Sequence, residues 1–242
     1  MDEATRRDYL QSLGIDPWLP RAGRMVAPAA AVAPAANNAA AREEPLQAAA
    51  VAASADNWPA VRAEVAACTR CTLHRTRTNT VFGVGATNAR WMVIGEAPGA
   101  DEDVQGEPFV GRAGQLLTAM LKACGLARSE VFIANILKCR PPNNRDPLPE
   151  EVRQCLPYLT RQIALLRPQL ILAVGRIAAH NLLATEMPLG RLRGQVHRYG
   201  EFDTPLIVTY HPAYLLRSPG EKRKAWDDLK FAMSICPPKA AA

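Results

Sequence analysis

The sequence lacks the features that would place a protein in a membrane or send it out of the cell. No apolar run approaches the roughly 18 residues that a membrane-spanning helix needs. The first residues, MDEATRRDYL, are not followed by the apolar stretch of a secretory signal peptide. We therefore expect a cytoplasmic protein with no membrane partner. In a reducing compartment its six cysteines are expected to be metal ligands, reactive thiols or core residues, not disulfides.

Large apolar side chains are scarce in residues 20–56, which are rich in Ala and Pro. Such a segment cannot bury enough surface to offset its ordering entropy, so it is predicted to be a disordered linker. Residues 1–19 carry one apolar stripe and predict a short amphipathic helix. That helix could dock on a replication or repair protein, or pack on its own core. Residues 57–242 are predicted to form the folded domain.

Positive charge is concentrated in the folded part. The whole chain has a net charge of +6, but residues 1–56 hold five arginines against seven acidic residues, so residues 57–242 carry +8. This asymmetry indicates a polyanionic partner such as a nucleic acid. The alternative is an ordinary charge that only keeps the protein in solution.

Apolar strand-like runs alternate with amphipathic helical patterns. This alternation predicts an α/β fold, a three-layer αβα sandwich around a four-stranded, mainly parallel sheet. In such sheets ligands bind beyond the carboxyl ends of the strands. GEAPG, the region of Asn135 and YHPAYLLR all follow expected strands there. The expected strands cover residues 91–95, 131–137, 170–174 and 205–212, and the expected helices cover 57–67, 113–125, 148–166, 176–183 and 221–236.

Four of the cysteines suggest a metal site. Cys68 and Cys71 form a C-x-x-C pair, Cys139 follows a strand, and Cys155 lies on the next helix. The pair alone is compatible with zinc, an iron–sulfur cluster or a redox dithiol. Fifteen residues separate Cys139 from Cys155, too many for a second zinc knuckle, which favours a [4Fe–4S] cluster over zinc. The other two cysteines lie on apolar helix faces and are expected in the core: Cys124 and Cys236.

Two polar residues after strands are candidates for ligand contacts. Asn135 offers one acceptor and a pair of donors, which suits the edge of a base, but it could equally tie down a loop. His211 could donate to an anionic or carbonyl oxygen, or simply cap a helix. A short segment after it combines bulky residues with a cation and is expected to be a loop that either wedges into a base stack or folds back on the core. It comprises Tyr214, Leu215, Leu216 and Arg217.

These motifs together resemble one family. GEAPGADEDVQGEPFVGRAGQLL, VFIANILKCRPPNNRDPLPEE and HPAYLLR, with the four cysteines, closely resemble the family 4 uracil-DNA glycosylases, bacterial and archaeal iron–sulfur enzymes. The resemblance extends from about Trp58 to about Ile235. It implies the uracil-DNA glycosylase fold and a monomeric, nucleoid-associated DNA repair enzyme. Such an enzyme hydrolyses the N-glycosidic bond of deoxyuridine in single- or double-stranded DNA, releasing uracil and leaving an abasic site.

The resemblance also implies catalytic roles. Glu96 and the backbone around Ala97 would hold the attacking water, and His211 would hydrogen-bond uracil O2. A related branch carries an aspartate where this chain has Ala97, so a strong general base is missing there. Another branch traps its product with a basic insertion, KRRIH, and the absence of this insertion favours a turnover enzyme.

Further roles concern the base, the DNA and the cluster. Phe109 would stack on uracil, Asn135 would read its edge, and Glu102 would lie on the C5 side and help exclude the methyl group of thymine. Gly99 belongs to the glycines that let the backbone approach a flat ring. The expected phosphate contacts are Lys138, Arg140 and Arg145, and the cluster ligands are Cys68, Cys71, Cys139 and Cys155. The competing hypothesis is a non-catalytic nucleic-acid-binding module whose cluster senses redox state.

Overall fold

Four parallel strands form the centre of the structure, a computed structural model that describes residues 57–238. Their order in the sheet is β3, β2, β4, β6, and every residue of the first three is buried. Because these strands are covered on both faces, they are continuous apolar runs instead of alternating patterns. They are β2 (Trp91–Gly95), β3 (Phe132–Asn135), β4 (Leu170–Val174) and β6 (Thr204–Thr209). The helix and linker predicted within residues 1–56 lie outside the described residues.

Two short antiparallel strands extend the sheet at its edges. β1 (Val84–Gly85) pairs with β3, and β5 (His197–Tyr199) pairs with β6. The predicted α/β class and the four parallel strands are therefore confirmed, but the sheet is mixed and has six strands. The edge strands are only two and three residues long and only partly buried, so no apolar run indicates them.

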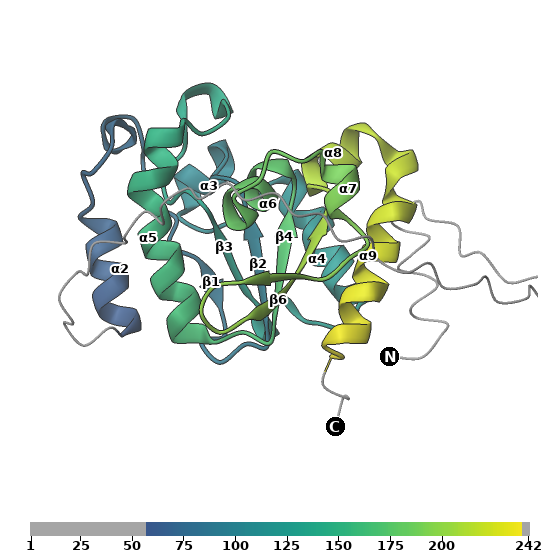
Figure 1. Ribbon diagram of the computed structural model, residues 1–242. Coiled ribbons are helices and arrows are strands. Elements are labelled where there is room, and N and C mark those ends of the chain that lie inside the picture. The colour runs from purple at the N-terminus through teal and green to yellow at the C-terminus, as the bar shows by residue number, and fades with distance from the viewer. Residues whose placement is uncertain (1–56, 239–242) are drawn as a thin grey trace, which may run out of the picture.

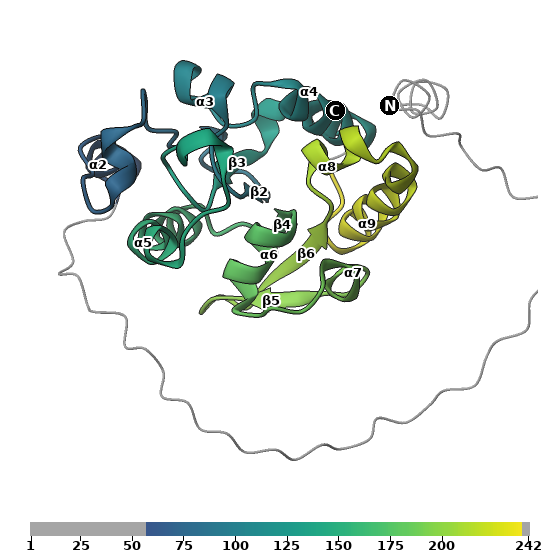
Figure 2. The ribbon, with the colours of Figure 1, turned by 90° about the horizontal axis from the view of Figure 1, so that it is seen from above.

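Helices cover both faces of the sheet, which gives the predicted three layers (Figures 1 and 2). Alternate strand residues serve the two cores: Met92 and Ile94 pack with α2, α5 and α6, whereas Trp91 and Val93 pack with α4 and α9. The helices are α2 (Trp58–Ala66), α3 (Ala100–Gln105), α4 (Arg112–Ala123), α5 (Pro149–Leu166), α6 (Arg176–Leu183), α7 (Leu189–Leu192), α8 (Pro212–Arg217) and α9 (Lys222–Ile235). No helix within residues 57–238 is long and apolar enough to cross a bilayer.

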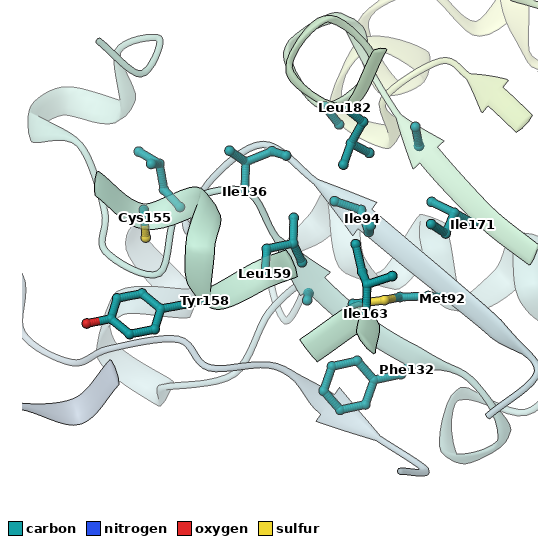
Figure 3. Close-up of a cluster of buried hydrophobic side chains, with 14 of the residues drawn as sticks. Met92, Ile94, Phe132, Ile136, Cys155, Tyr158, Leu159, Ile163, Ile171 and Leu182 are labelled. Atoms are coloured by element: carbon teal, nitrogen blue, oxygen red, sulfur yellow. The ribbon is translucent and has the colours of Figure 1, made fainter. Parts of the chain in front are cut away.

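Helix α5 is the longest element within residues 57–238 and packs in one of the two cores. Its first turn begins with Pro149, and the side chain of Glu151 accepts a hydrogen bond from the Leu148 amide at 2.8 Å, which caps the helix. Leu159 and Ile163 point from α5 toward β2 (Figure 3). The cap therefore holds the loop before α5 to the helix, and the apolar face of α5 holds the helix to the sheet.

The strands that follow β2 lie on both sides of it in the sheet. The chain first forms β3 on one side of β2 and later forms β4 on the other side, so the order of the strands reverses between β2 and β4. Open α/β sheets bind ligands just beyond such a point, outside the carboxyl ends of the strands. Glu96 directly follows β2 and lies at this position.

The core predicts a clear stability effect. Leu159 is fully buried, so Leu159→Ala removes apolar contacts and leaves a cavity. We expect the free energy of unfolding to fall by about 2–5 kcal/mol, measured by urea denaturation. Val104→Ala, at a site that is 68% exposed, should change it by less than about 0.5 kcal/mol. Equal losses in the two variants would contradict this description of the core.

Candidate active site

A cavity of about 420 Å³ opens beyond the carboxyl ends of the central strands. Its walls come from the segments after β2 and β3, the loop between α3 and α4, and the start of α8. Segments far apart in the sequence are thus brought together as predicted. The predicted site residues that line it are Glu96, Ala97, Gly99, Glu102, Phe109, Asn135, Arg145, His211, Tyr214 and Arg217.

Glu96 is a carboxylate in a partly dehydrated place. Burial, and after it the nearby carboxylate of Asp146, raise its pKa to about 7, while Arg176 opposes the rise. Asp146 also lines the cavity and forms an ion pair of 2.7 Å with Arg176. Sequence reasoning missed both residues. The only signal was the position of Asp146 directly after Arg145 in the RPPNNRD motif.

His211 is a neutral hydrogen-bond donor in this cavity. Burial, and after it the charge of Arg217, lower its pKa to about 4, while Glu102 opposes them. Its Nδ1 accepts a hydrogen bond from the Ala213 amide at 3.1 Å, at the start of α8. A neutral imidazole whose Nδ1 is an acceptor carries its proton on Nε2. The ring therefore keeps one N–H donor for a ligand.

Phe109 forms an aromatic wall beside His211. The two ring centroids lie 5.6 Å apart with a tilt of 32°. A Cβ atom at Gly95 would lie 2.5 Å from Cζ of the Phe109 ring, so this close approach requires glycine at the end of β2. The ring is thus seated on the backbone of the central strand.

Asn135, at the end of β3, is 1% exposed and carries an unusual acceptor. Its Oδ1 has no hydrogen-bond partner among the described residues although the residue lines the cavity. A buried acceptor without a protein partner is costly, so this oxygen is available to a donor that enters the cavity. A loop-tying role for this oxygen finds no support in the contacts.

Two acidic residues of the first motif hold backbone amides. Glu102 accepts hydrogen bonds from the amides of Gly99, Val110 and Gly111 at 3.1, 2.9 and 3.1 Å. Asp103 is buried and accepts from the amides of Thr78 and Asn79. These carboxylates shape the loops around the cavity. The expected contact of Glu102 with the C5 side of a pyrimidine stays a prediction.

The four predicted cluster cysteines line one small second cavity together with Arg77 and Lys138. Arg77 donates to the Cys139 sulfur at 3.1 Å, and the Lys138 amide donates to the Cys155 sulfur at 3.2 Å. Among the described residues, no three metal-ligating side chains gather closely enough to hold a single metal ion. A zinc ion needs four ligands within about 2.3 Å of one point, whereas each thiolate of a four-iron cluster bonds a different iron atom. Four cysteine thiols around one cavity are a set of donors that a four-iron cluster can use.

Lys138 does not face DNA, and its predicted phosphate contact is wrong. The side chain is 1% exposed, and its ammonium group donates to the Asn135 carbonyl at 2.9 Å and to Gln162 Oε1 at 2.7 Å. These two oxygens solvate the charge inside the domain, where no phosphate can reach it. Lys138 instead joins the cysteine cavity to the strand that presents Asn135.

The predicted wedge is only partly right. The segment is helix α8 and not a loop, and helical spacing turns Leu215 into the core against α4 and α9, where it is 1% exposed. Leu215 therefore cannot enter a base stack in this conformation. Tyr214, Leu216 and Arg217 remain exposed beside the cavity, so their contact with DNA stays a prediction.

Two other predicted phosphate contacts are half-buried, in the loop between β3 and α5. Arg140 donates to Asn144 Oδ1 at 2.7 Å, and Arg145 holds Glu151 through two hydrogen bonds of 2.9 and 2.6 Å. Both stay predictions. Cys124 and Cys236 are buried, which confirms their expected place in the core.

Comparison with known proteins identifies the class of protein. Residues 82–230 match the family model described as the uracil DNA glycosylase superfamily, which is more than half of the chain. The chain therefore belongs to the uracil DNA glycosylase superfamily.

Individual relatives show which family within this superfamily the chain resembles. The chain is 47% identical over 180 residues to a type-4 uracil-DNA glycosylase of Archaeoglobus fulgidus, covering 72% of this chain and 90% of that protein. It is 41% identical over 179 residues to a type-4 uracil-DNA glycosylase of Thermotoga maritima, covering 72% and 92%. A type-5 uracil-DNA glycosylase of Pyrobaculum aerophilum is 34% identical over 150 residues, covering 54% and 64%. The resemblance to family 4 is confirmed.

The raised pKa of Glu96 predicts a pH-dependent cost to stability. The folded chain holds a proton on Glu96 up to about pH 7, whereas a glutamate at the reference pKa of 4.5, as in an unfolded chain, has already released it. The favourable contribution is therefore complete below pH 4.5 and is lost as the pH rises through about 7. Glu96→Gln removes this titration.

We expect the free energy of unfolding of Glu96→Gln, relative to the parent protein, to rise between pH 4.5 and 7 and then to level off. Urea denaturation of both proteins across this range measures the difference. A difference that does not vary with pH would show that the Glu96 carboxyl is hydrated like an exposed one.

Proposed function

We propose that this chain is a uracil-DNA glycosylase of type 4, which hydrolyses the N-glycosidic bond of deoxyuridine in DNA, releases uracil and leaves an abasic site. The proposal rests on one observation. A carboxylate, a neutral imidazole donor, an aromatic ring and an amide oxygen without a protein partner all line the same cavity. The identity to type-4 enzymes over most of the chain supports the same substrate.

Recognition of the base follows from these groups. A base inside a duplex is inaccessible, so the enzyme extrudes it or takes it from a single strand. Uracil then stacks on Phe109, and its N3–H donates to the vacant Oδ1 of Asn135. This bond satisfies an acceptor that is otherwise buried without a partner. Cytosine has no proton on N3 and would leave that acceptor unpaired, so the pocket discriminates between the two bases.

Bond cleavage requires stabilisation of two opposite charges. Uracil leaves as an anion, and the Nε2–H of His211 donates to its O2 in a partly water-excluded cavity. The deoxyribose becomes oxocarbenium-like, as in other glycosidic cleavages, and the Glu96 carboxylate stabilises this positive charge. A water oxygen then bonds to C1′ and loses its proton. Glu96, with a pKa of about 7, is suited to accept that proton, since Ala97 cannot.

The cysteine cavity is proposed to hold a [4Fe–4S] cluster. Cys68, Cys71, Cys139 and Cys155 would be its ligands. When bound, the cluster supplies iron–thiolate bonds that cross-link three distant segments, and uracil excision itself needs no electron transfer. Lys138 connects this cross-link to the carbonyl of Asn135, so the metal site supports the residue that reads the base.

Release of uracil decides between catalysis and mere binding. The parent protein should release free uracil from a deoxyuridine-containing oligonucleotide, which a non-catalytic module cannot do. His211→Ala removes the O2 donor and should lower the single-turnover rate by about 10²–10³ while DNA binding persists. His197→Ala is the control, because His197 lies on edge strand β5 and bonds the Leu192 carbonyl instead of lining the cavity. Absence of uracil release by the parent protein, or full activity of His211→Ala, would overturn the proposal.

The cluster ligands predict a spectroscopic difference between buried cysteines. Cys155→Ser should lose much of the visible absorption of the anaerobically purified protein and lower its melting temperature, because one cross-link is broken. Cys124→Ala, a buried cysteine outside the cysteine cavity, should keep the absorption. A colourless, zinc-loaded protein with full activity would reverse the assignment of the metal.

A further inference from the structure

The aromatic wall of the cavity rests on an uncommon backbone conformation. Phe109 has φ = 54°, in the left-handed region that side chains other than glycine, asparagine and aspartate seldom adopt. Such a conformation persists only where the surrounding structure holds it. The ring is 7% exposed and lies against Gly95, so a relaxed backbone at residue 109 would move the ring off the strand end.

Both peptide groups that flank Phe109 are held by charged side chains. On the carboxyl side, Glu102 Oε1 accepts from the amides of Val110 and Gly111. On the amino side, Nη2 of Arg128 donates to the Pro108 carbonyl. The two side chains come from different elements, since Glu102 lies in α3 and Arg128 begins the short 3₁₀ helix η2 (Arg128–Glu130), beyond the end of α4.

Arg128 is placed to act on the loop and not on the ligand. It is half-buried but is not among the residues that line the cavity. Its other terminal nitrogen, Nη1, is buried and has no hydrogen-bond partner among the described residues. Within residues 57–238 the guanidinium makes one side-chain hydrogen bond to a distant segment, that to the buried Pro108, and burying a charged group with so few partners is costly. Its cost is understandable if the position of the Phe109 ring depends on it.

We propose that Arg128 is a positioning residue for uracil binding, which holds the Phe109 ring over Gly95 through the Pro108 carbonyl. The inference rests on the proposed function, since it concerns how the same cavity takes its base. Glu102 holds the far side of the same residue. The ring is thereby fixed before a base arrives, and stacking does not have to order the loop.

Inhibition by free uracil tests the proposal, because uracil needs the stacking wall. Arg128→Met keeps the bulk of the side chain but removes the donor. It should raise the inhibition constant of uracil about ten- to one-hundred-fold, the range expected for loss of one base–aromatic stack. Arg128→Lys, which can make the single bond to the Pro108 carbonyl, should restore most of the affinity.

An abasic ligand separates positioning from a general effect on folding. Affinity for an oligonucleotide with a tetrahydrofuran abasic analogue should stay within about twofold in Arg128→Met, since that ligand has no base to stack. In a Phe109→Ala background, Arg128→Met should cause no further loss of uracil inhibition. Arg198→Gln is the control, because Arg198 also donates to a backbone carbonyl, that of Asp203 at 3.0 Å, but on edge strand β5.

The outcomes are distinguishable. Unchanged inhibition by uracil in folded Arg128→Met, or equal losses toward uracil and the abasic ligand, would overturn the role of Arg128. If Arg128→Met does not fold, Arg128→Gln, which is too short to reach Pro108, takes its place under the same criteria. A parent protein that neither releases uracil nor is inhibited by it would overturn the proposed function and not this inference alone.

Discussion

A strand that is buried on both faces can present polar groups only at its ends. In this protein β2, β3 and β4 obey that constraint along their whole length. The parallel register of the sheet then gathers the functional groups of separate segments at one edge. Glu96 follows β2, and Asn135 ends β3. The position of the cavity is therefore a consequence of how the sheet is buried.

The constraint extends to the electrostatics of the cavity. Walls made by buried strand ends and an aromatic ring exclude water, which disfavours charge on both central groups. Glu96 is consequently easier to protonate and His211 harder to protonate than in water. Near neutral pH the pair therefore comprises a titrating carboxyl group and a neutral imidazole. This combination matches a reaction that separates a positive sugar from a negative base.

The sequence predicts this architecture well where an apolar run is bounded by clear end signals. β2 and α6 begin and end at the predicted residues because glycine closes the first and precedes the second. Side-chain directions outside such runs were harder to predict. Lys138 points inward because Gln162 of α5 supplies an oxygen, and no local pattern announces a partner 24 residues away. In the same way, no local pattern indicates that Arg128 donates to the carbonyl of Pro108, 20 residues earlier in the chain.

Leu215 illustrates a different limit. Three bulky residues in a row resemble an exposed wedge if the segment is a loop, but a single turn of helix divides them between solvent and core. Whether α8 forms depends on contacts with α4 and α9 that the segment does not encode alone. The edge strands β1 and β5 likewise exist because longer neighbours offer them hydrogen bonds.

The hydrogen bond between the Ala213 amide and His211 has a consequence for the evolution of this protein. The proton position on the imidazole is set by a main-chain group at the start of α8 and not by an acidic side chain. Substitutions around the histidine can therefore alter the size or polarity of the cavity without altering which ring nitrogen donates. Only proline at position 213 would remove the amide itself. Substrate preference and the chemistry of the leaving group are thus free to vary independently.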